Sequence, residues 1–137
     1  MKIALVQMDV AHGKPVENKK HVKEMLERAL SEKPDVIVLP EMWNTGYALD
    51  ELDGLADKEG LNSQELLSHF AREHAVAIIG GSVAIEKDGK FYNTTYVYNK
   101  SGDLINTYSK VHLFGLMAED QYMSAGSSES VFELCLL

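Results

Sequence analysis

The stretch that decides the fold of this chain is Asp35-Val-Ile-Val-Leu-Pro-Glu-Met-Trp-Asn-Thr-Gly-Tyr47. Its residues 36–39 are apolar without polar alternation, which is typical of a strand buried on both faces of an α/β sheet. Pro40 has no N–H to donate to a strand ladder, so we expect the strand to end there. Glu41 is then presented at the carboxyl end of a central strand, where open α/β sheets place ligands and catalysis. A glutamate so placed is either a solvated loop residue or part of a site.

The residues before this stretch predict a β-α-β unit. Residues 3–8 form an apolar strand interrupted only by Gln7, Pro15 can start a helix, and Pro34 ends it. Because strands joined by a helical crossover run in parallel, the first two strands should be parallel neighbours. The helix is amphipathic, and one face carries Val22, Met25, Leu26, Ala29 and Leu30.

After Tyr47, the acidic and irregular residues 48–60 predict a surface loop near the site. Asn62 or Ser63 can cap a second helix, and residues 76–79 follow as a third buried strand. The pair Gly80-Gly81 then indicates a bend or a close approach of two backbones. The inner face of the second helix carries Leu66, Leu67, Phe70 and Ala71.

The last part of the chain changes to a meander of strands. Residues 82–86, 91–99 and 104–109 are strand candidates, joined by Asp88-Gly89 and Ser101-Gly102 turns. Asp-Gly between strand residues is a strong hairpin signal, so these strands should be antiparallel. The fold class predicted for residues 1–137 is therefore α/β, with one mixed β-sheet covered by helices on one face and no internal repeat or linker.

Composition excludes several classes of function. The 137 residues are 45% hydrophobic and 25% charged, which is ordinary globular usage. The net charge of −8 and a pI of about 5.0 disfavour binding to nucleic acid, whose phosphates require clustered Lys and Arg. No apolar run approaches the length of a membrane-spanning helix, and no signal-peptide pattern occurs, so we expect a cytoplasmic protein. The single cysteine, Cys135, excludes an internal disulfide and a multi-cysteine zinc site.

Four ordered motifs resemble those of one family. Leu39-Pro-Glu-Met-Trp-Asn-Thr-Gly-Tyr47 and Tyr108-Ser-Lys-Val-His-Leu-Phe114 resemble the glutamate and lysine motifs of the nitrilase superfamily, the carbon–nitrogen hydrolases, and most of all its ω-amidase branch. Lys2-Ile-Ala-Leu-Val-Gln-Met8 and Glu119-Asp-Gln-Tyr-Met-Ser-Ala-Gly126 fit the same family in the same order. The resemblance implies an α-β-β-α sandwich, of which these residues are the N-terminal half.

The resemblance also implies a catalytic triad of Glu, Lys and Cys, in which the cysteine follows the lysine motif in a segment resembling Ile-Cys-Tyr-Asp. No such motif occurs up to Leu137. Cys135 has none of the family's residues after it, and free cysteine is commonly a small buried hydrophobe. We therefore expect a truncated domain that lacks its nucleophile and, as given, hydrolyses no amide.

The residue types suit this chemistry. Glu41 can act as the base if burial raises its pKa towards neutrality, and the ammonium of Lys110 can pair with Glu41 and face a developing oxyanion. By resemblance, Glu119 orients the lysine or assists proton transfer; otherwise it is a rim residue of the loop 115–126. The segment from Trp43 to Tyr47 would form a wall of the substrate pocket. His112 either joins the site or is a hydrogen-bonded structural residue.

Two classes of function follow. The first is an amidase acting on a small-molecule amide without metal or cofactor, by resemblance the terminal amide of a dicarboxylic acid monoamide. The second is a non-catalytic remnant or interaction module. In both, an uncovered apolar sheet face favours homo-oligomers or association through the sheet, since exposed apolar surfaces and strand edges promote contacts between chains.

Overall fold

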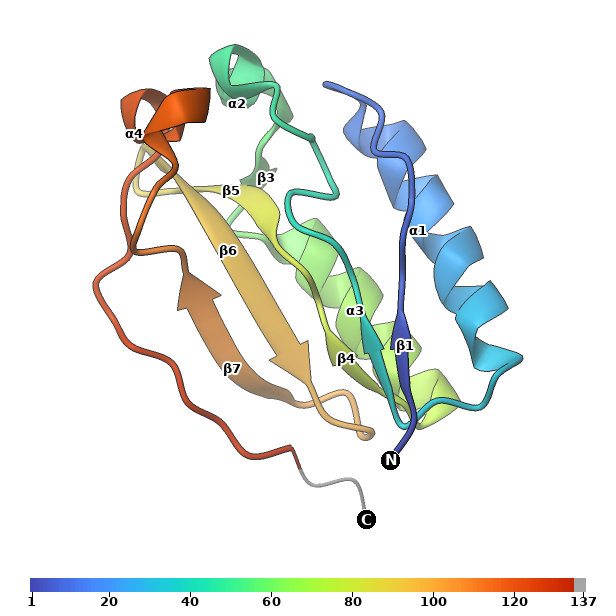
Figure 1. The fold of residues 1–137 in the computed structure, drawn as a ribbon. Coiled ribbons are helices and arrows are strands. Elements are labelled where there is room, and N and C mark those ends of the chain that lie inside the picture. The colour runs from blue at the N-terminus through green and yellow to red at the C-terminus, as the bar shows by residue number, and fades with distance from the viewer. Residues whose placement is uncertain (135–137) are drawn as a thin grey trace.

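The computed structural model describes residues 1–134 and shows a mixed β-sheet with two long helices (Figure 1). The strands follow the order β1-β2-β4-β6-β5-β3 across the sheet, and β7 pairs with β6. The elements, in chain order, are β1 (Ile3–Leu5), α1 (Pro15–Leu30), β2 (Val36–Val38), η1 (Leu49–Glu51), α2 (Leu52–Leu55), β3 (Asp57–Lys58), α3 (Leu61–His74), β4 (Ala77–Ile79), β5 (Val83–Lys87), β6 (Lys90–Tyr98), β7 (Leu104–Ser109), η2 (Gly115–Met117) and α4 (Glu119–Tyr122).

The predicted β-α-β unit is confirmed. β2 lies between β1 and β4 and runs parallel to both, in register Ala4 to Ile37 to Ile78. Helix α1 begins at Pro15 and buries its apolar stripe against the sheet, with Val22 and Leu26 fully buried. Because a parallel pair requires a crossover, this helix follows from the strand pairing. The first strand is shorter than the predicted 3–8, since after Leu5 only the Val6 N–H continues the ladder, to the Val38 carbonyl.

The predicted meander is also confirmed. β6 pairs antiparallel with β5, with β7 and with the end of β4. Asp88 and Gly89, which join β5 to β6, both have positive φ, 51° and 71°. Two successive positive φ angles match the twist of a two-residue hairpin, which explains the Asp-Gly pair.

The segment 48–60 corrects the sequence analysis, which predicted an irregular surface loop. It contains η1, α2 and β3, and its Leu49 and Leu52 are buried with Met42, Ala84 and Met123 in a second small core. The apolar residues of this acidic segment face inward because Met42, Ala84 and Met123, from other segments, pack against them. The segment therefore shares a core with Met42, which lies in the turn that carries Glu41.

The predicted cap of the second helix is likewise wrong. α3 begins at Leu61, and neither Asn62 nor Ser63 caps it with a side chain. Instead the Asp57 carboxylate, from β3, accepts the backbone N–H groups of Asn62 at 3.2 Å and Ser63 at 2.7 Å. A carboxylate at a helix N-terminus satisfies unpaired N–H groups and interacts favourably with the helix dipole.

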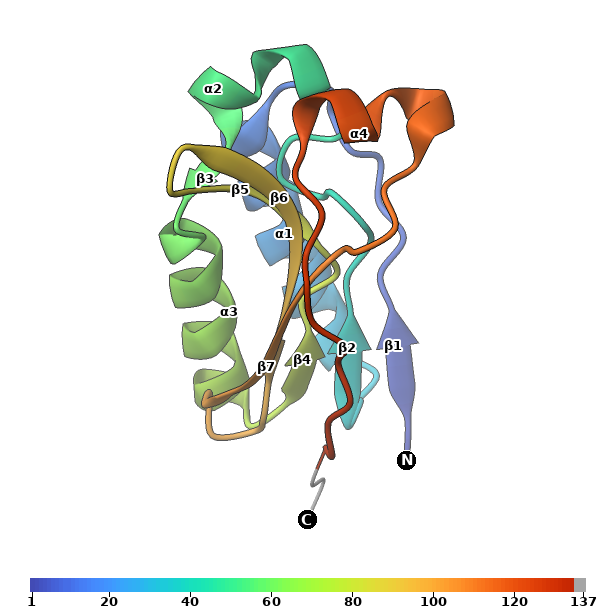
Figure 2. The same ribbon diagram turned by 90° about the vertical axis from the view of Figure 1, so that its left-hand side faces the viewer.

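The two faces of the sheet differ in their cover. α1 and α3 lie on one face, as predicted, and the main core lies between them and the sheet (Figures 1 and 2). On the other face, Ile3 and Leu5 are 48% and 73% exposed. The segment from Ser127 to Phe132 passes over the β6–β7 part of that face. No helix within residues 1–134 combines the length and apolar composition needed to cross a bilayer.

Gly81 provides a test of how the site is supported. Its φ is +59°, and a Cβ there would lie 2.0 Å from the carbonyl oxygen of Pro40, next to Glu41. We expect Gly81→Ala to lower the free energy of unfolding by about 3 kcal/mol, because left-handed strain and overpacking add together. Gly89→Ala is the matched control, with φ +71° and open space, and should cost only about 1 kcal/mol. Urea unfolding measures both, and equal losses would contradict the close backbone approach.

Candidate functional site

Glu41 lies in a tight turn that follows β2. Within the turn the Gly46 N–H donates to the Met42 carbonyl at 2.8 Å, and Met42 has a positive φ of 52°. Ser82, which immediately precedes β5, fixes the turn, because its hydroxyl accepts the Met42 N–H at 3.0 Å. The chain therefore presents Glu41 at the carboxyl end of a central strand, in a turn held by the segment that joins β4 to β5.

Two buried asparagines, Asn18 and Asn44, hold the same turn through hydrogen bonds. Asn44 exchanges two hydrogen bonds with the backbone of Ala84, at 2.8 and 2.9 Å. Asn18, on α1, donates to the Asn44 carbonyl at 2.9 Å. Buried amides that use their hydrogen-bonding groups in this way make a rigid support.

Lys110 follows β7, and its side chain contacts that of Glu41. Its Nζ lies 2.9 Å from Oε1 of Glu41 and 2.8 Å from Oε2 of Glu119. Its backbone N–H donates to the Asn93 carbonyl at 2.8 Å, and its own carbonyl accepts the Gly126 N–H at 2.9 Å. One ammonium is thus shared by two carboxylates from distant parts of the chain.

Glu119 is fully buried at the start of α4 and lies beside Lys110 rather than on the rim of the loop. Its Oε2 also accepts the Phe114 N–H at 2.8 Å, and its Oε1 accepts an N–H of the Asn93 side chain at 2.8 Å. A buried carboxylate requires a charge partner and hydrogen bonds on its remaining lone pairs, and Glu119 has both.

The surroundings keep all three groups charged. Burial raises the pKa of the Glu41 carboxyl, but hydrogen bonds from Lys110, Asn93 and Tyr47 outweigh it, and the pKa is lowered below 4.5. Burial therefore does not bring the pKa of Glu41 towards neutrality, which was the condition set for its action as a base. Burial lowers the pKa of the Lys110 ammonium, but Glu119 and Glu41 raise it overall above its ordinary value. The cluster carries one negative charge in excess.

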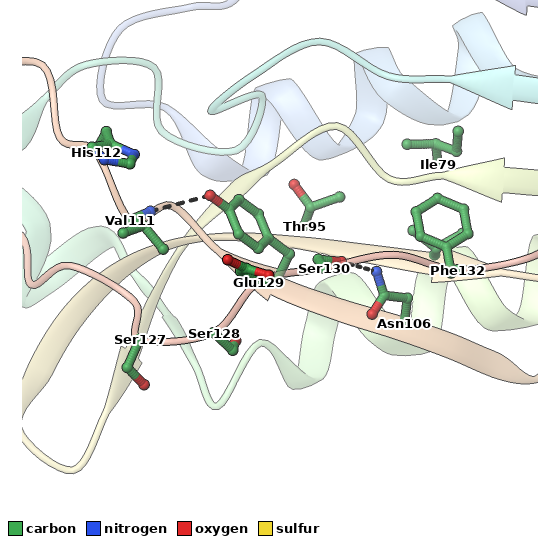
Figure 3. A pocket seen from close by; sticks show the side chains of 12 residues that line it. Ile79, Thr95, Asn106, Val111, His112, Ser127, Ser128, Glu129, Ser130 and Phe132 are labelled. Carbon is green, nitrogen blue, oxygen red and sulfur yellow. Dashed lines mark hydrogen bonds between the residues drawn. The ribbon is translucent and has the colours of Figure 1, made fainter.

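A small cavity opens beside this cluster. Its volume is about 310 Å³, and it is lined by Leu39, Glu41, Gly81, Ser82, Asn93, Thr95, Tyr108 and Lys110. Thr95 and Tyr108 also line a larger hollow of about 530 Å³ between the sheet and the segment from Ser127 to Phe132 (Figure 3). Polar groups therefore line a small cavity next to a larger, mainly apolar hollow, as in small-molecule sites.

The residues predicted to line the pocket divide into three cases. Tyr47 lies against Glu41, and burial, the Glu41 hydrogen bond and its charge raise the Tyr47 pKa to about 12. His112 is exposed and lines the larger hollow, not the cavity beside Glu41. Trp43 is 1% exposed, and its ring N–H donates to the Gly80 carbonyl at 2.9 Å. Its side chain packs in the main core and does not line the cavity beside Glu41, which corrects the prediction for this residue.

Asn93, which contacts both carboxylates, was not predicted as a site residue from the sequence. It lies in β6 and is 3% exposed. The available signal was an asparagine in the middle of a predicted strand, where an amide is unfavourable unless its polar groups find partners. Residues 1–134 contain no group of three His, Cys, Asp or Glu side chains arranged to hold a metal ion. Cys135 lies outside the described residues.

Comparison with known proteins gives one consistent result. A family model described as carbon-nitrogen hydrolase matches residues 2–136. The 2-oxoglutaramate amidase of Bacillus subtilis is 47% identical over 132 residues, which are 96% of this chain and 51% of that protein. Omega-amidase NIT2-B of Xenopus laevis is 33% identical over 139 residues, 96% of this chain and 50% of that protein.

A solved structure supports the same likeness. Nit3 of Saccharomyces cerevisiae, a member of branch 10 of the nitrilase superfamily, superposes with a TM-score of 0.87 at 27% identity. The match covers 98% of this chain and 51% of that protein. The chain thus spans about half the length of the relatives that it matches.

The buried Glu119 predicts an acid-dependent loss of stability. Burial raises its pKa, but hydrogen bonds from Asn93, Lys110 and the Phe114 N–H lower it overall below 4.5. A lowered pKa stabilises the fold above the unfolded-state pKa, and this contribution is lost as pH falls through the folded-state pKa. Glu119→Gln should therefore cost about 3 kcal/mol at pH 7 and progressively less below pH ~4.5.

The measurement is urea unfolding of both proteins between neutral and acid pH. Asp120→Asn is the control, because Asp120 is the exposed neighbour of Glu119 and should change stability by less than about 0.5 kcal/mol at any pH. A Glu119→Gln deficit that stays constant down to acid pH would show that the charge of Glu119 does not stabilise the fold.

Proposed function

The chain belongs to the carbon-nitrogen hydrolase family, and we propose that residues 1–137 form half of an amidase domain and supply its base and its ammonium. The observation that carries this proposal is the contact of Lys110 with both Glu41 and Glu119 beside a cavity at the carboxyl end of β2. A base and a positive charge facing one space are two of the three groups that amide hydrolysis by a covalent route requires.

In the proposed reaction Glu41 accepts the proton of a cysteine thiol, and the sulfur forms a bond to the amide carbon. The carbonyl π electrons move to oxygen, and the resulting oxyanion faces the ammonium of Lys110. Collapse of this intermediate breaks the C–N bond, and the leaving nitrogen takes up the proton held by Glu41 and departs as ammonia, which leaves Glu41 ionised again. Water, deprotonated by Glu41, then hydrolyses the thioester to the acid and restores the thiol.

The low pKa of Glu41 fits this sequence when the charge of Lys110 is considered. In the resting site the ammonium of Lys110 lowers the pKa of Glu41. As an oxyanion forms next to Lys110, that positive charge is shared with the new anion, and Glu41 becomes a stronger base as the reaction proceeds. Glu119 keeps Lys110 charged and in place throughout.

The proposed substrate is the terminal amide of a small dicarboxylic acid monoamide, with 2-oxoglutaramate the first choice. The support is the identity to a 2-oxoglutaramate amidase and to omega-amidases. Tyr47 and His112 are proposed to contact the substrate, Tyr47 beside Glu41 and His112 from the larger hollow. We propose no metal or cofactor, because the charged side chains supply both proton transfer and oxyanion stabilisation.

A chimera tests the proposal directly. Residues 1–134 replace the matching half of the Bacillus subtilis amidase, and ammonia release from 2-oxoglutaramate is measured. We expect activity, with kcat/KM reduced about 10³-fold by Glu41→Gln or Lys110→Ala. The control is the exposed helix pair Lys20 and Glu24, 3.9 Å apart, whose Lys20→Ala and Glu24→Gln variants should retain activity. An active chimera that is indifferent to Glu41→Gln would refute the assigned base.

The 137-residue chain alone should release no ammonia above background from 2-oxoglutaramate, and Cys135→Ala should behave identically. The reason is that a base and an ammonium without their nucleophile provide only positioning and charge. Ammonia release that disappears in Cys135→Ala would identify Cys135 as the nucleophile.

We propose a second role, self-association through the uncovered sheet face, because Ile3 and Leu5 are exposed there. Sedimentation velocity should show concentration-dependent association that Leu5→Lys abolishes, since a charge on an apolar contact opposes its burial. Val16→Lys is the control, because Val16 is 85% exposed on α1, which covers the other face. A chain that stays monomeric, or equal effects of the two variants, would exclude the sheet face.

A further inference from the structure

Asn93 contacts all three charged residues of the site. Its Nδ2 lies 2.9 Å from Oε1 of Glu41 and 2.8 Å from Oε1 of Glu119. Its backbone carbonyl accepts the N–H of Lys110 at 2.8 Å. One buried residue of β6 therefore fixes two side chains and one backbone position that come from three separate segments.

The chemistry of an amide decides what this contact can do. Both partners of the Asn93 side chain are carboxylate oxygens, which only accept when ionised, so the NH₂ group and not the carbonyl must face them. Its two hydrogens can serve two acceptors, one on each glutamate. A protonated carboxyl would place a competing donor in the same position, so the amide favours the ionised form of both groups.

Without the Asn93 bridge, two carboxylates around one ammonium can share a proton instead of both staying ionised. Like charges that share a site raise the pKa of one of them, so that the pair can hold a proton between its oxygens. Such a proton would occupy Glu41 or Glu119 and remove the free base that the proposed reaction needs. The amide opposes this outcome because it donates to Oε1 of each carboxylate.

We propose that Asn93 is a positioning residue that keeps Glu41 and Glu119 as two separate anions around Lys110. Its consequence for catalysis rests on the proposed function, but the charge state itself does not. Asn93 acts through the two carboxylates and not on the substrate.

Other titratable groups face the pair and do not replace the amide. Tyr47, in the turn after β2, is a hydrogen-bond partner of Glu41 only, and its pKa of about 12 keeps it protonated at neutral pH. Tyr108, on β7, lines the same cavity, and its hydroxyl accepts the Val111 N–H at 3.3 Å. Within residues 1–134, the side-chain groups that reach Glu119 are Lys110 and Asn93. The bridge between the carboxylates therefore depends on Asn93 alone among the neutral side chains of this part of the chain.

The test is a ¹³C NMR titration of the glutamate carboxyl groups in the 137-residue chain, assigned through Glu41→Gln and Glu119→Gln. Asn93→Leu has similar volume and no donors, and we expect it to raise the pKa of at least one of the two carboxyls by about one unit or more. Asn93→Asp should have a larger effect, because a third carboxylate then shares the ammonium. Asn106→Asp is the control. Asn106 lies on the neighbouring strand, is bonded to Ser130 and lines the larger hollow, so the variant adds the same charge outside the cavity beside Glu41.

Unchanged pKa values of Glu41 and Glu119 in a folded Asn93→Leu chain would overturn the proposal, because a merely structural asparagine would alter stability and not titration. Near-UV circular dichroism reports folding, and Asn93→Ser, which retains a single donor, replaces the leucine variant if that variant does not fold. In the chimera, Asn93→Leu should also shift the acid limb of kcat/KM to higher pH. A chimera without amidase activity would refute the proposed function and leave the titration result intact.

Discussion

The site depends on one ammonium that balances two carboxylates. Lys110 brings together Glu41, from the turn after β2, and Glu119, from the start of α4. Because Glu119 is fully buried, the segment that carries it can pack against the sheet only while Lys110 compensates its charge. The same ammonium holds Glu41 ionised, so that the interaction that stabilises this corner of the fold also sets its chemistry.

Hydrogen bonds and close backbone packing hold Glu41 in position beside Lys110. The turn that carries Glu41 rests on Gly81 and Ser82, and the amides of Asn18 and Asn44 close it from behind. Asn18 belongs to α1, which together with α3 covers the face of the sheet where the main core lies. The opposite face has little cover within the described residues, and the chain spans about half the length of its relatives, so the two faces differ in how completely this chain buries them.

Local patterns in the sequence were sufficient for most of the architecture. An unbroken apolar run before Pro40 indicated a central strand, and the helical spacing of Val22 and Leu26 indicated α1. Asp88-Gly89 indicated a hairpin because only residues that tolerate positive φ fit its turn. These inferences are reliable because each depends on residues within a few positions of one another. The motifs around Glu41 and Lys110 added the family, which the comparisons confirm.

Contacts between distant residues decided what the sequence alone could not. The fold of residues 48–60, the Asp57 cap of α3 and the burial of Trp43 all follow from neighbours that are remote in the chain. The pKa of Glu41 is lowered rather than raised because three hydrogen-bond donors converge on it from two other segments and its own turn. The sequence by itself determined the two long helices, the main strands and the charged residues Glu41 and Lys110 that follow two of those strands. Tertiary structure alone decided the position of Asn93 between the two carboxylates, because that position depends on the register of β6 against β7.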